Sequence, residues 1–263
     1  MNFTNNDAKM ARYGEWAVVT GASSGIGREI ARQLAAAGLN LLLVARRAVE
    51  LEQLRSEIEG TGKAKAIALP LDLALPGASA EIFDASANLN TGLLVNAAGF
   101  GLGGPFLDHP LSEESLLIDV NCRALMELTH RFGTRFAAQR RGGIVLFSSI
   151  VAFQGVPRSA NYAATKAYVQ SLGEALADEL SAHGVDVLIS KPGPTHSGFA
   201  TRAGMNLGKA EKVEDVATAT LAALGRSKSV TPGVLSKILL GSLMTAPRSL
   251  RVLIMKAIMR SMT

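Results

Sequence analysis

Residues 17–27 read AVVTGASSGIG, a short apolar run followed by a glycine-rich turn and then by a helical pattern. Its glycines follow the spacing GxxxGxG rather than GxGxxG. Glycine lets the backbone turn tightly and approach a bound group closely, and the free N–H groups at a helix start attract a phosphate. The turn is therefore expected to hold a pyrophosphate through Gly21, Ser23, Ser24, Gly25, Ile26 and Gly27. Support for this interpretation of the glycine pattern comes from the rest of the chain.

The alternation of strand and helix continues beyond this turn. Short apolar runs predict strands at residues 17–20, 41–44, 64–69, 93–96, 144–147, 185–190 and 229–231. Helical patterns cover residues 26–37, 49–59, 78–88, 113–139, 161–183 and 213–224. Apolar runs without polar alternation are typical of strands buried on both faces, and strand–helix alternation indicates a parallel sheet. We predict one α/β domain with a doubly wound parallel sheet of about seven strands.

Composition excludes several classes of protein. The chain has 263 residues, of which 48% are hydrophobic, so it is not intrinsically disordered. No apolar stretch is long enough to span a bilayer, and residues 1–16 contain no apolar segment of a secretory signal. The single Cys122 cannot form an internal disulfide, which predicts a reducing cytoplasmic location and a small packed side chain. No metal site is expected, because the four histidines share no ligand spacing: His109, His130, His183 and His196.

The net charge of +5 is unevenly distributed. Residues 1–215 hold 20 basic and 22 acidic side chains, whereas residues 216–263 hold seven basic and no acidic side chains. Pro247 divides the last part into two expected helices. We therefore predict a catalytic domain over residues 1–233 and a basic, apolar helical extension over residues 234–263.

Motifs after the other strands join the glycine-rich turn in a recognisable order. They are NAAG at 96–99, Asn121 in a long helix, Ser148-Ser149, YAATK at 162–166 and KPG at 191–193. Together with TGASSGIG at 20–27, they closely resemble the short-chain dehydrogenase/reductase family over residues 14–233. The resemblance implies a Rossmann-type fold, a nicotinamide cofactor, and hydride transfer to or from a carbonyl or alcohol carbon.

The end of the second strand predicts which cofactor is preferred. An NAD site usually has an Asp or Glu there for the ribose 2′-hydroxyl, whereas this chain has Arg46 and Arg47. Two guanidiniums suit the 2′-phosphate of NADP(H), with Arg46 as the first choice and Arg47 as the alternate. The alternative is that both arginines are solvated residues at a helix start. By resemblance, the remaining cofactor residues are Asp72 and Leu73 at the adenine, Asn96 and Ala97 at the adenosine ribose, Gly193 and Thr195 at the nicotinamide, and Gly99 and Pro192.

The chemistry is predicted to lie with Tyr162 and Lys166, which share one helix face because they are four residues apart. Tyr162 would exchange a proton with the substrate oxygen, and the Lys166 ammonium would lower the pKa of the phenol and hold the nicotinamide ribose. Ser149 precedes Tyr162 by 13 residues, the usual family separation, and would hydrogen-bond the substrate oxygen. Asn121 resembles the family residue that kinks its helix and holds a water between Lys166 and solvent. Ser148 is expected to be structural.

Three loops are expected to enclose the substrate, at residues 99–110, 150–158 and 194–206. Their few charges favour an apolar or acyl carbonyl compound, or the matching alcohol, over a sugar or a phosphorylated substrate. The alternative is that half of the larger side chains pack inward and line nothing. These side chains are Phe100, Leu102, Phe106, Ile150, Phe153, Val156, Phe199 and Met205, with charges at Asp108, Arg158 and Arg202.

The extension leaves three alternatives open. It can pack over the substrate loops or a partner subunit, lie on an anionic membrane surface as a peripheral contact, or bind nucleic acid, which the lack of interleaved aromatic residues disfavours. In its second helix, Leu250, Leu253, Ile254, Ala257 and Ile258 share one side, and Val252, Met255 and Met259 fall among the basic residues.

The functional prediction is an NADP(H)-dependent oxidoreductase. The alternative, a catalytically idle NADP(H)-binding regulator or scaffold, is disfavoured by the intact set Asn121, Ser149, Tyr162 and Lys166. The family resemblance also implies a homodimer or homotetramer that pairs through residues 113–139 and 161–183.

Overall fold

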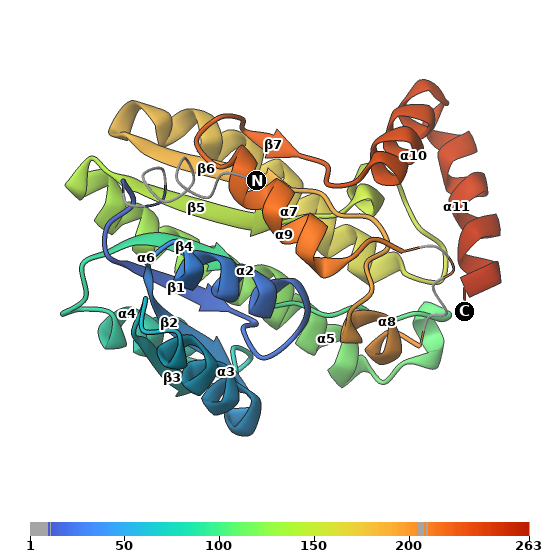
Figure 1. Cartoon of the computed structure of the whole chain (residues 1–263). Helices are drawn as coiled ribbons and strands as arrows, with labels where there is room; N and C mark the ends of the chain where they lie inside the picture. Colours follow the sequence, from blue (N-terminus) through green and yellow to red (C-terminus); the bar gives the residue numbers. More distant parts are fainter. Residues whose placement is uncertain (1–9, 11, 205–207, 209, 263) are drawn as a thin grey trace.

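A computed structural model describes residues 10, 12–204, 208 and 210–262. Its centre is a seven-stranded sheet in the order β3-β2-β1-β4-β5-β6-β7, with every neighbouring pair parallel (Figure 1). The strands are β1 (Trp16–Thr20), β2 (Asn40–Ala45), β3 (Ala66–Pro70), β4 (Thr91–Asn96), β5 (Gly142–Phe147), β6 (Val185–Ser190) and β7 (Ser229–Val230). All seven predicted strands are confirmed, within two residues at each end.

Helices cover both faces of the sheet. One face packs on α2 (Gly25–Ala36), α3 (Ala48–Gly60) and α9 (Val213–Ala223), and the other on α4 (Ala78–Ala85), α6 (Leu125–Gln139) and α7 (Ala160–Glu179). Successive strand residues alternate between the two cores, so that Val19 and Leu43 belong to the first and Val18 and Leu42 to the second. Because both faces of the central strands are buried, their middle residues are apolar and the polar ones lie toward the strand ends. The predicted Rossmann-type doubly wound fold is confirmed.

The helix expected over residues 113–139 is interrupted at Asn121, where the family resemblance implied a kink. It consists of α5 (Leu111–Ile118), a π-helical segment η2 (Asp119–Ala124) and α6. A π-helical turn widens the helix locally and often marks a functional site. Short 3-10 turns are η1 (Phe106–Asp108), η3 (Ile150–Phe153) and η4 (Ser181–His183). The last of these replaces the end of the helix expected over residues 161–183.

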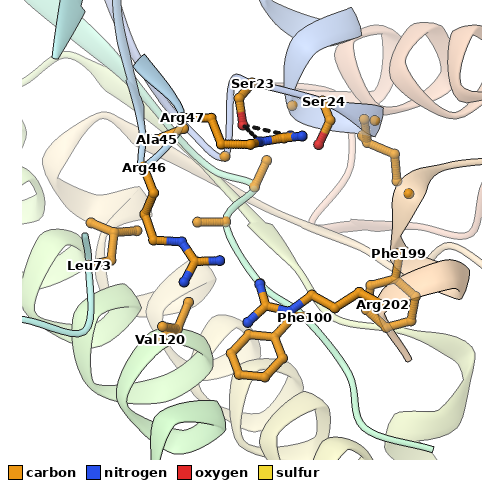
Figure 2. A pocket seen from close by; sticks show the side chains of 18 of the residues that line it. Ser23, Ser24, Ala45, Arg46, Arg47, Leu73, Phe100, Val120, Phe199 and Arg202 are labelled. Carbon is orange, nitrogen blue, oxygen red and sulfur yellow. Dashed lines mark hydrogen bonds between the residues drawn. The ribbon is translucent and has the colours of Figure 1, made fainter. Parts of the chain in front are cut away.

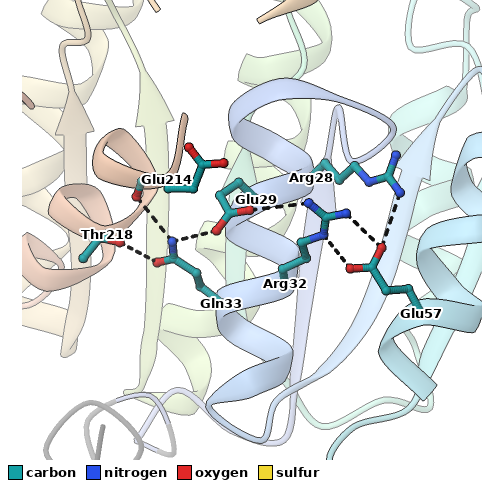
Figure 3. Close-up of polar contacts among 7 residues, drawn as sticks. All are labelled: Arg28, Glu29, Arg32, Gln33, Glu57, Glu214 and Thr218. Carbon is teal, nitrogen blue, oxygen red and sulfur yellow. Dashed lines mark hydrogen bonds and ion pairs between the residues drawn. The ribbon is translucent and has the colours of Figure 1, made fainter. Parts of the chain in front are cut away.

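Polar contacts hold α2, the helix that follows the glycine-rich turn, between its two neighbours (Figure 3). On the α3 side, Arg32 Nε lies 2.7 Å from Glu57 Oε1, and this guanidinium lowers the pKa of the Glu57 carboxyl. On the α9 side, Thr218 Oγ1 donates to Gln33 Oε1 at 3.2 Å. These contacts lie on the surface, where each stabilises by at most about 1 kcal/mol. Together they fix the orientation of α2, and hence the direction in which its N-terminus points.

The extension forms α10 (Val234–Thr245) and α11 (Arg248–Met262) on either side of Pro247, as predicted. Figure 1 shows the two helices beside the N-terminal start of α7. Leu243, Met255 and Met259 form one buried cluster with Val156, in a loop expected at the substrate, and with Ala163 in the first turn of α7. The structure therefore buries the α11 face that carries the methionines and leaves Leu250, Leu253 and Ile254 exposed on the opposite, more apolar face.

Candidate active site

A cavity of about 470 Å³ opens at the carboxyl ends of the central strands. It lies where the strand order reverses, because β2 and β3 follow β1 on one side and β4 lies on the other. Open α/β sheets bind ligands at this switch point. Twelve predicted cofactor residues line it: Gly21, Ser23, Ser24, Gly25, Ile26, Gly27, Arg46, Arg47, Asp72, Leu73, Ala97 and Gly99.

The glycine-rich turn is shaped as a cradle for a phosphate. Gly21 has φ +69°, and a Cβ there would lie 2.8 Å from the backbone nitrogen of Ala98. A Cβ on Gly27 would lie 2.5 Å from the carbonyl oxygen of Gly21, so only glycine fits either position. Within the described chain, Ser24 makes no side-chain cap for α2, which leaves the first-turn N–H groups at the cavity. Free donors beside a turn whose Gly21 and Gly27 carry no side chain fit the pyrophosphate of a dinucleotide.

Basic side chains gather at the β2 end of the cavity (Figure 2). Arg47 donates to the hydroxyl of Ser23 from Nη2 at 3.0 Å and lies 3.3 Å from Glu50. Arg46 Nη1 lies 3.8 Å from Asp72 Oδ2, too long for a strong hydrogen bond. Both guanidiniums remain about half exposed, and the Ser23 hydroxyl stands beside them. Two guanidiniums and a hydroxyl fit a phosphate monoester such as the 2′-phosphate of NADP(H).

Six predicted cofactor residues lie outside this lining: Asn96, Pro192, Gly193 and Thr195, together with Tyr162 and Lys166, which form a separate group. The Asn96 amide points toward α6 and donates to Thr129 Oγ1 at 3.1 Å. Thr195 Oγ1 donates to the carbonyl oxygen of Gly193 at 3.0 Å. A Cβ on Gly193 would lie 2.2 Å from Ser236 Oγ, so the segment that carries Pro192 and Gly193 packs closely against the first turn of α10.

Tyr162, Lys166 and Ser149 form a second group beside the cavity. Ser149 follows β5 and lies close enough to Tyr162 to affect the pKa of the phenol, while its hydroxyl donates to the Pro192 carbonyl oxygen at 3.4 Å. Lys166 Nζ lies 5.7 Å from the centre of the Tyr162 ring. The Lys166 ammonium donates to the carbonyl oxygen of Phe147 at 2.8 Å. Burial lowers the pKa of Lys166 to about 8, with a small opposing contribution from Cys122.

The pKa of Tyr162 differs from the sequence-based expectation. Burial raises it above the ordinary value, and the hydrogen bond with Ser149 opposes this rise. Lys166 was expected to lower it, but the ammonium group is directed to the Phe147 carbonyl rather than to the phenol. In the structure the Tyr162 proton therefore stays on the phenol at neutral pH.

Asn121 in the π-helical segment connects three parts of the site. Its Oδ1 accepts from the N–H of Phe100 at 3.1 Å, and its Nδ2 donates to the Phe100 carbonyl oxygen at 2.9 Å and to Thr165 Oγ1 at 3.1 Å. A Cβ on Gly99 would lie 3.1 Å from Asn121 Oδ1 and 3.6 Å from Lys166 Nζ. Asn121 thus joins the loop after β4 to α7, next to Lys166. Ser148 is structural, since its hydroxyl donates to the Lys166 carbonyl oxygen at 3.0 Å.

The segment after β6 brings residues into the cavity that the sequence did not assign to it. Ser197, Gly198, Phe199 and Arg202 line the wall opposite β2, and the last three belong to the short helix α8 (Gly198–Arg202). Phe199 and Arg202 were expected at the substrate. The one feature in the sequence that is compatible with a position in the cofactor cavity is the length of the Arg202 side chain. Further lining residues outside the predicted cofactor set are Ala45, Leu71, Ala98, Phe100 and Val120.

The predicted substrate side chains divide into two sets. The Phe199 ring lies 5.2 Å from the Tyr162 ring, and Phe100 is buried at the cavity. Val156 instead packs under the extension, and Phe106 is half exposed. Met205 lies outside the described residues. The alternative that half of the larger side chains pack inward holds for Val156 but not for the exposed Phe106.

Within residues 10, 12–204, 208 and 210–262, no three His, Cys, Asp or Glu side chains are placed to hold a metal ion. In the same part of the chain, no helix combines the length and the apolar character needed to cross a bilayer.

Known proteins resemble this chain over most of its length. A family model described as short chain dehydrogenase matches residues 15–207. A 7beta-hydroxysteroid dehydrogenase of Mediterraneibacter gnavus is 32% identical over 184 residues, which are 70% of each chain. A solved structure of a 7beta-hydroxysteroid dehydrogenase superposes with a TM-score of 0.86 at 27% identity, covering 97% of this chain and 99% of the other. A short-chain dehydrogenase from Sphingobium yanoikuyae in complex with NADPH gives a TM-score of 0.78 at 30% identity, covering 89% and 96%.

Proposed function

This chain belongs to the short-chain dehydrogenase/reductase family, and we propose that it transfers a hydride between NADP(H) and a hydrophobic ketone, aldehyde or acyl carbonyl, or the matching alcohol. As a family member it is an oxidoreductase that acts on CH–OH groups. One observation carries the proposal: Ser149 and Tyr162 are neighbours, with Lys166 one helical turn away, and they lie beside a cavity that fits a dinucleotide.

Tyr162, Ser149 and Lys166 have different roles in the proton transfer. A bound nicotinamide supplies or accepts the hydride. The Tyr162 phenol donates a proton to the substrate oxygen as charge develops there, and the Ser149 hydroxyl donates a hydrogen bond to the same oxygen. Lys166, with a pKa of about 8, is mostly an ammonium ion at neutral pH, and it would hold the nicotinamide ribose with its charge one helical turn from Tyr162. The Phe147 carbonyl fixes the position of that charge.

NADP(H) is proposed as the preferred cofactor. The support is the placement of Arg46, Arg47 and the Ser23 hydroxyl around one end of the cavity, together with a similar structure that contains NADPH. Removing one of two guanidiniums from a phosphate weakens its binding, so Arg46→Ala should shift the Kd ratio toward NADH. Titration of both cofactors measures this ratio. An unchanged ratio would exclude Arg46 as the discriminating residue.

The substrate is proposed to be apolar because Phe100 and Phe199 face the cavity and Phe199 lies against Tyr162. Sterol ketones and long acyl thioesters fit this chemistry. The test is NADPH oxidation with a panel of apolar ketones, aldehydes and acyl thioesters, with sugars as controls. Turnover of apolar members supports the proposal. If NADPH binds tightly and the whole panel is inert, the idle-regulator alternative is favoured.

A homodimer is proposed through the helices around the π-helical segment. Exposed apolar side chains lie on each: Ile118 on α5, Met126 on α6 and Tyr168 on α7. Such residues are typical of subunit interfaces. Light scattering should give a dimer or larger species that dissociates in Met126→Glu, and a monomeric wild-type protein would contradict the proposal.

The exposed face of α11 is proposed to contact an anionic lipid surface. Leu250, Leu253 and Ile254 are exposed there near Lys256 and Arg260, and residues 216–263 contain no acidic side chain. Two such basic faces would repel each other, whereas anionic headgroups complement them. The cytoplasmic location remains a prediction from the single cysteine.

A further inference from the structure

Helix α8 closes the cavity from the side opposite β2. A Cβ on Gly25 would lie 3.2 Å from Ser197 Cβ, so the start of α8 abuts the glycine-rich turn. The Phe199 ring contacts the Tyr162 ring at 5.2 Å and would lie 2.6 Å from a Cβ on Gly101. One short helix therefore contacts the phosphate-binding turn at its beginning and the proposed proton donor within its first turn.

Arg202 ends α8 and reaches into the cavity (Figure 2). Its guanidinium carbon lies 3.7 Å from the centre of the Phe100 ring, a stacking contact that fixes its direction. Figure 2 shows the guanidiniums of Arg202 and Arg46 directed toward each other from opposite walls. Among the described residues, no carboxylate lies within 4 Å of the Arg202 guanidinium.

Two cations that face each other across a partly desolvated cavity repel. Partial burial, and then the charge of Arg46, lower the pKa of Arg202, while Asp72 and Glu113 oppose this effect. Asp72 is the one carboxylate among the described lining residues, and it already pairs with Arg46. An anion between the two guanidiniums would replace the repulsion with two charge-assisted contacts. Such an anion would lie beside Arg46 and Asp72, at the adenosine end of the cavity, and not at the glycine-rich turn.

We propose that Arg202 and Arg46 form a clamp for the 2′-phosphate of NADP(H), with Arg202 supplied by α8. When the clamp is occupied, α8 is held over the cavity, and Phe199 is held against Tyr162. Recognition of the 2′-phosphate is thereby coupled to the shape of the substrate side. The inference rests on the proposed cofactor and adds a discriminating residue more than 150 positions away from Arg46 in the sequence.

The test uses two probes that differ only in the 2′-phosphate, adenosine 2′,5′-bisphosphate and adenosine 5′-monophosphate. Calorimetric titration of the full chain should show Arg202→Gln binding the bisphosphate about tenfold more weakly than wild type, equal to about 1.4 kcal/mol, with monophosphate affinity unchanged. Arg202→Lys keeps the charge without the planar fork and should restore part of the affinity. Arg226→Gln, which removes an exposed arginine outside the cavity lining, is the matched control and should bind both probes normally.

Hydrogen exchange gives a second readout that does not depend on turnover. NADP⁺ should slow amide exchange over residues 198–202 in wild type, and NAD⁺ or the Arg202→Gln variant should show much less slowing. Equal loss of affinity for both probes, or no loss for either, would overturn the clamp. If wild type binds NADPH tightly, either result overturns the clamp alone, whereas a wild-type protein that binds no NADPH contradicts the proposed function itself.

Discussion

Replacing Asn121 with alanine should destabilise the protein and loosen the cofactor cavity at the same time. The Asn121 side chain is almost fully buried and makes three hydrogen bonds, two to the Phe100 backbone and one to Thr165. A hydrogen bond contributes about 1 kcal/mol net, so the loss should be about 3 kcal/mol. The Phe100 N–H and carbonyl would also lose their partner. Because Gly99 and Phe100 line the cavity, NADPH affinity should fall with stability.

Urea unfolding monitored by circular dichroism measures the stability loss, and fluorescence titration measures NADPH affinity. Thr165→Val is the matched control, since it removes one of the three Asn121 hydrogen bonds and keeps the size of the side chain. The Thr165 hydroxyl also donates to the Tyr162 carbonyl oxygen at 2.8 Å, so the control loses two hydrogen bonds and should cost about 2 kcal/mol, with NADPH affinity nearly unchanged. If Asn121→Ala costs no more stability than Thr165→Val and leaves NADPH affinity equally unchanged, the reasoning about the Phe100 contacts is refuted.

Two further predictions concern the buried ammonium group of Lys166 and the exposed apolar face of α11. Burial sets the Lys166 pKa at about 8 against an ordinary 10.5, so between these pH values the unfolded chain binds more protons than the folded chain. Wild-type stability relative to Lys166→Met should therefore rise from pH 8 to 10.5, by up to about 3 kcal/mol in denaturant unfolding, and a constant difference would contradict the burial of the charge. The double variant Leu253→Ser/Ile254→Ser should not float with vesicles of phosphatidylcholine and phosphatidylglycerol, whereas Arg226→Gln should float as wild type does. If the three proteins float equally, or if none of them floats, the lipid contact is rejected.

The sequence predicted the sheet well because strands buried on both faces leave a direct signal. The apolar runs around Val18, Leu42 and Leu94 each contribute side chains to both cores. They could therefore be recognised without knowing where in the sheet each strand lies. The glycine-rich turn was equally readable, since Gly21 and Gly27 have no space for a Cβ. Most of the predicted cofactor lining follows from these local features.

Three features depend on contacts between distant segments and could not be predicted from the local pattern. The π-helical segment around Asn121 was implied only by the family resemblance, because the pattern shows one helix and the stabilising contacts are made to Phe100 and Thr165. The face of α11 that is buried is the one that packs against the loop at Val156, although the opposite face of the helix is more apolar. The reach of Arg202 into the cavity depends on where α8 is placed by tertiary packing.

Turnover by Tyr162→Phe tests the central claim most directly. The change removes one hydroxyl and keeps the ring that contacts Phe199 and Lys166. With a substrate that wild type reduces, the variant should bind NADPH with unchanged affinity and show no measurable turnover, because no phenol is left to donate the proton. Unimpaired turnover in this variant would show that another group donates the proton and would contradict the account.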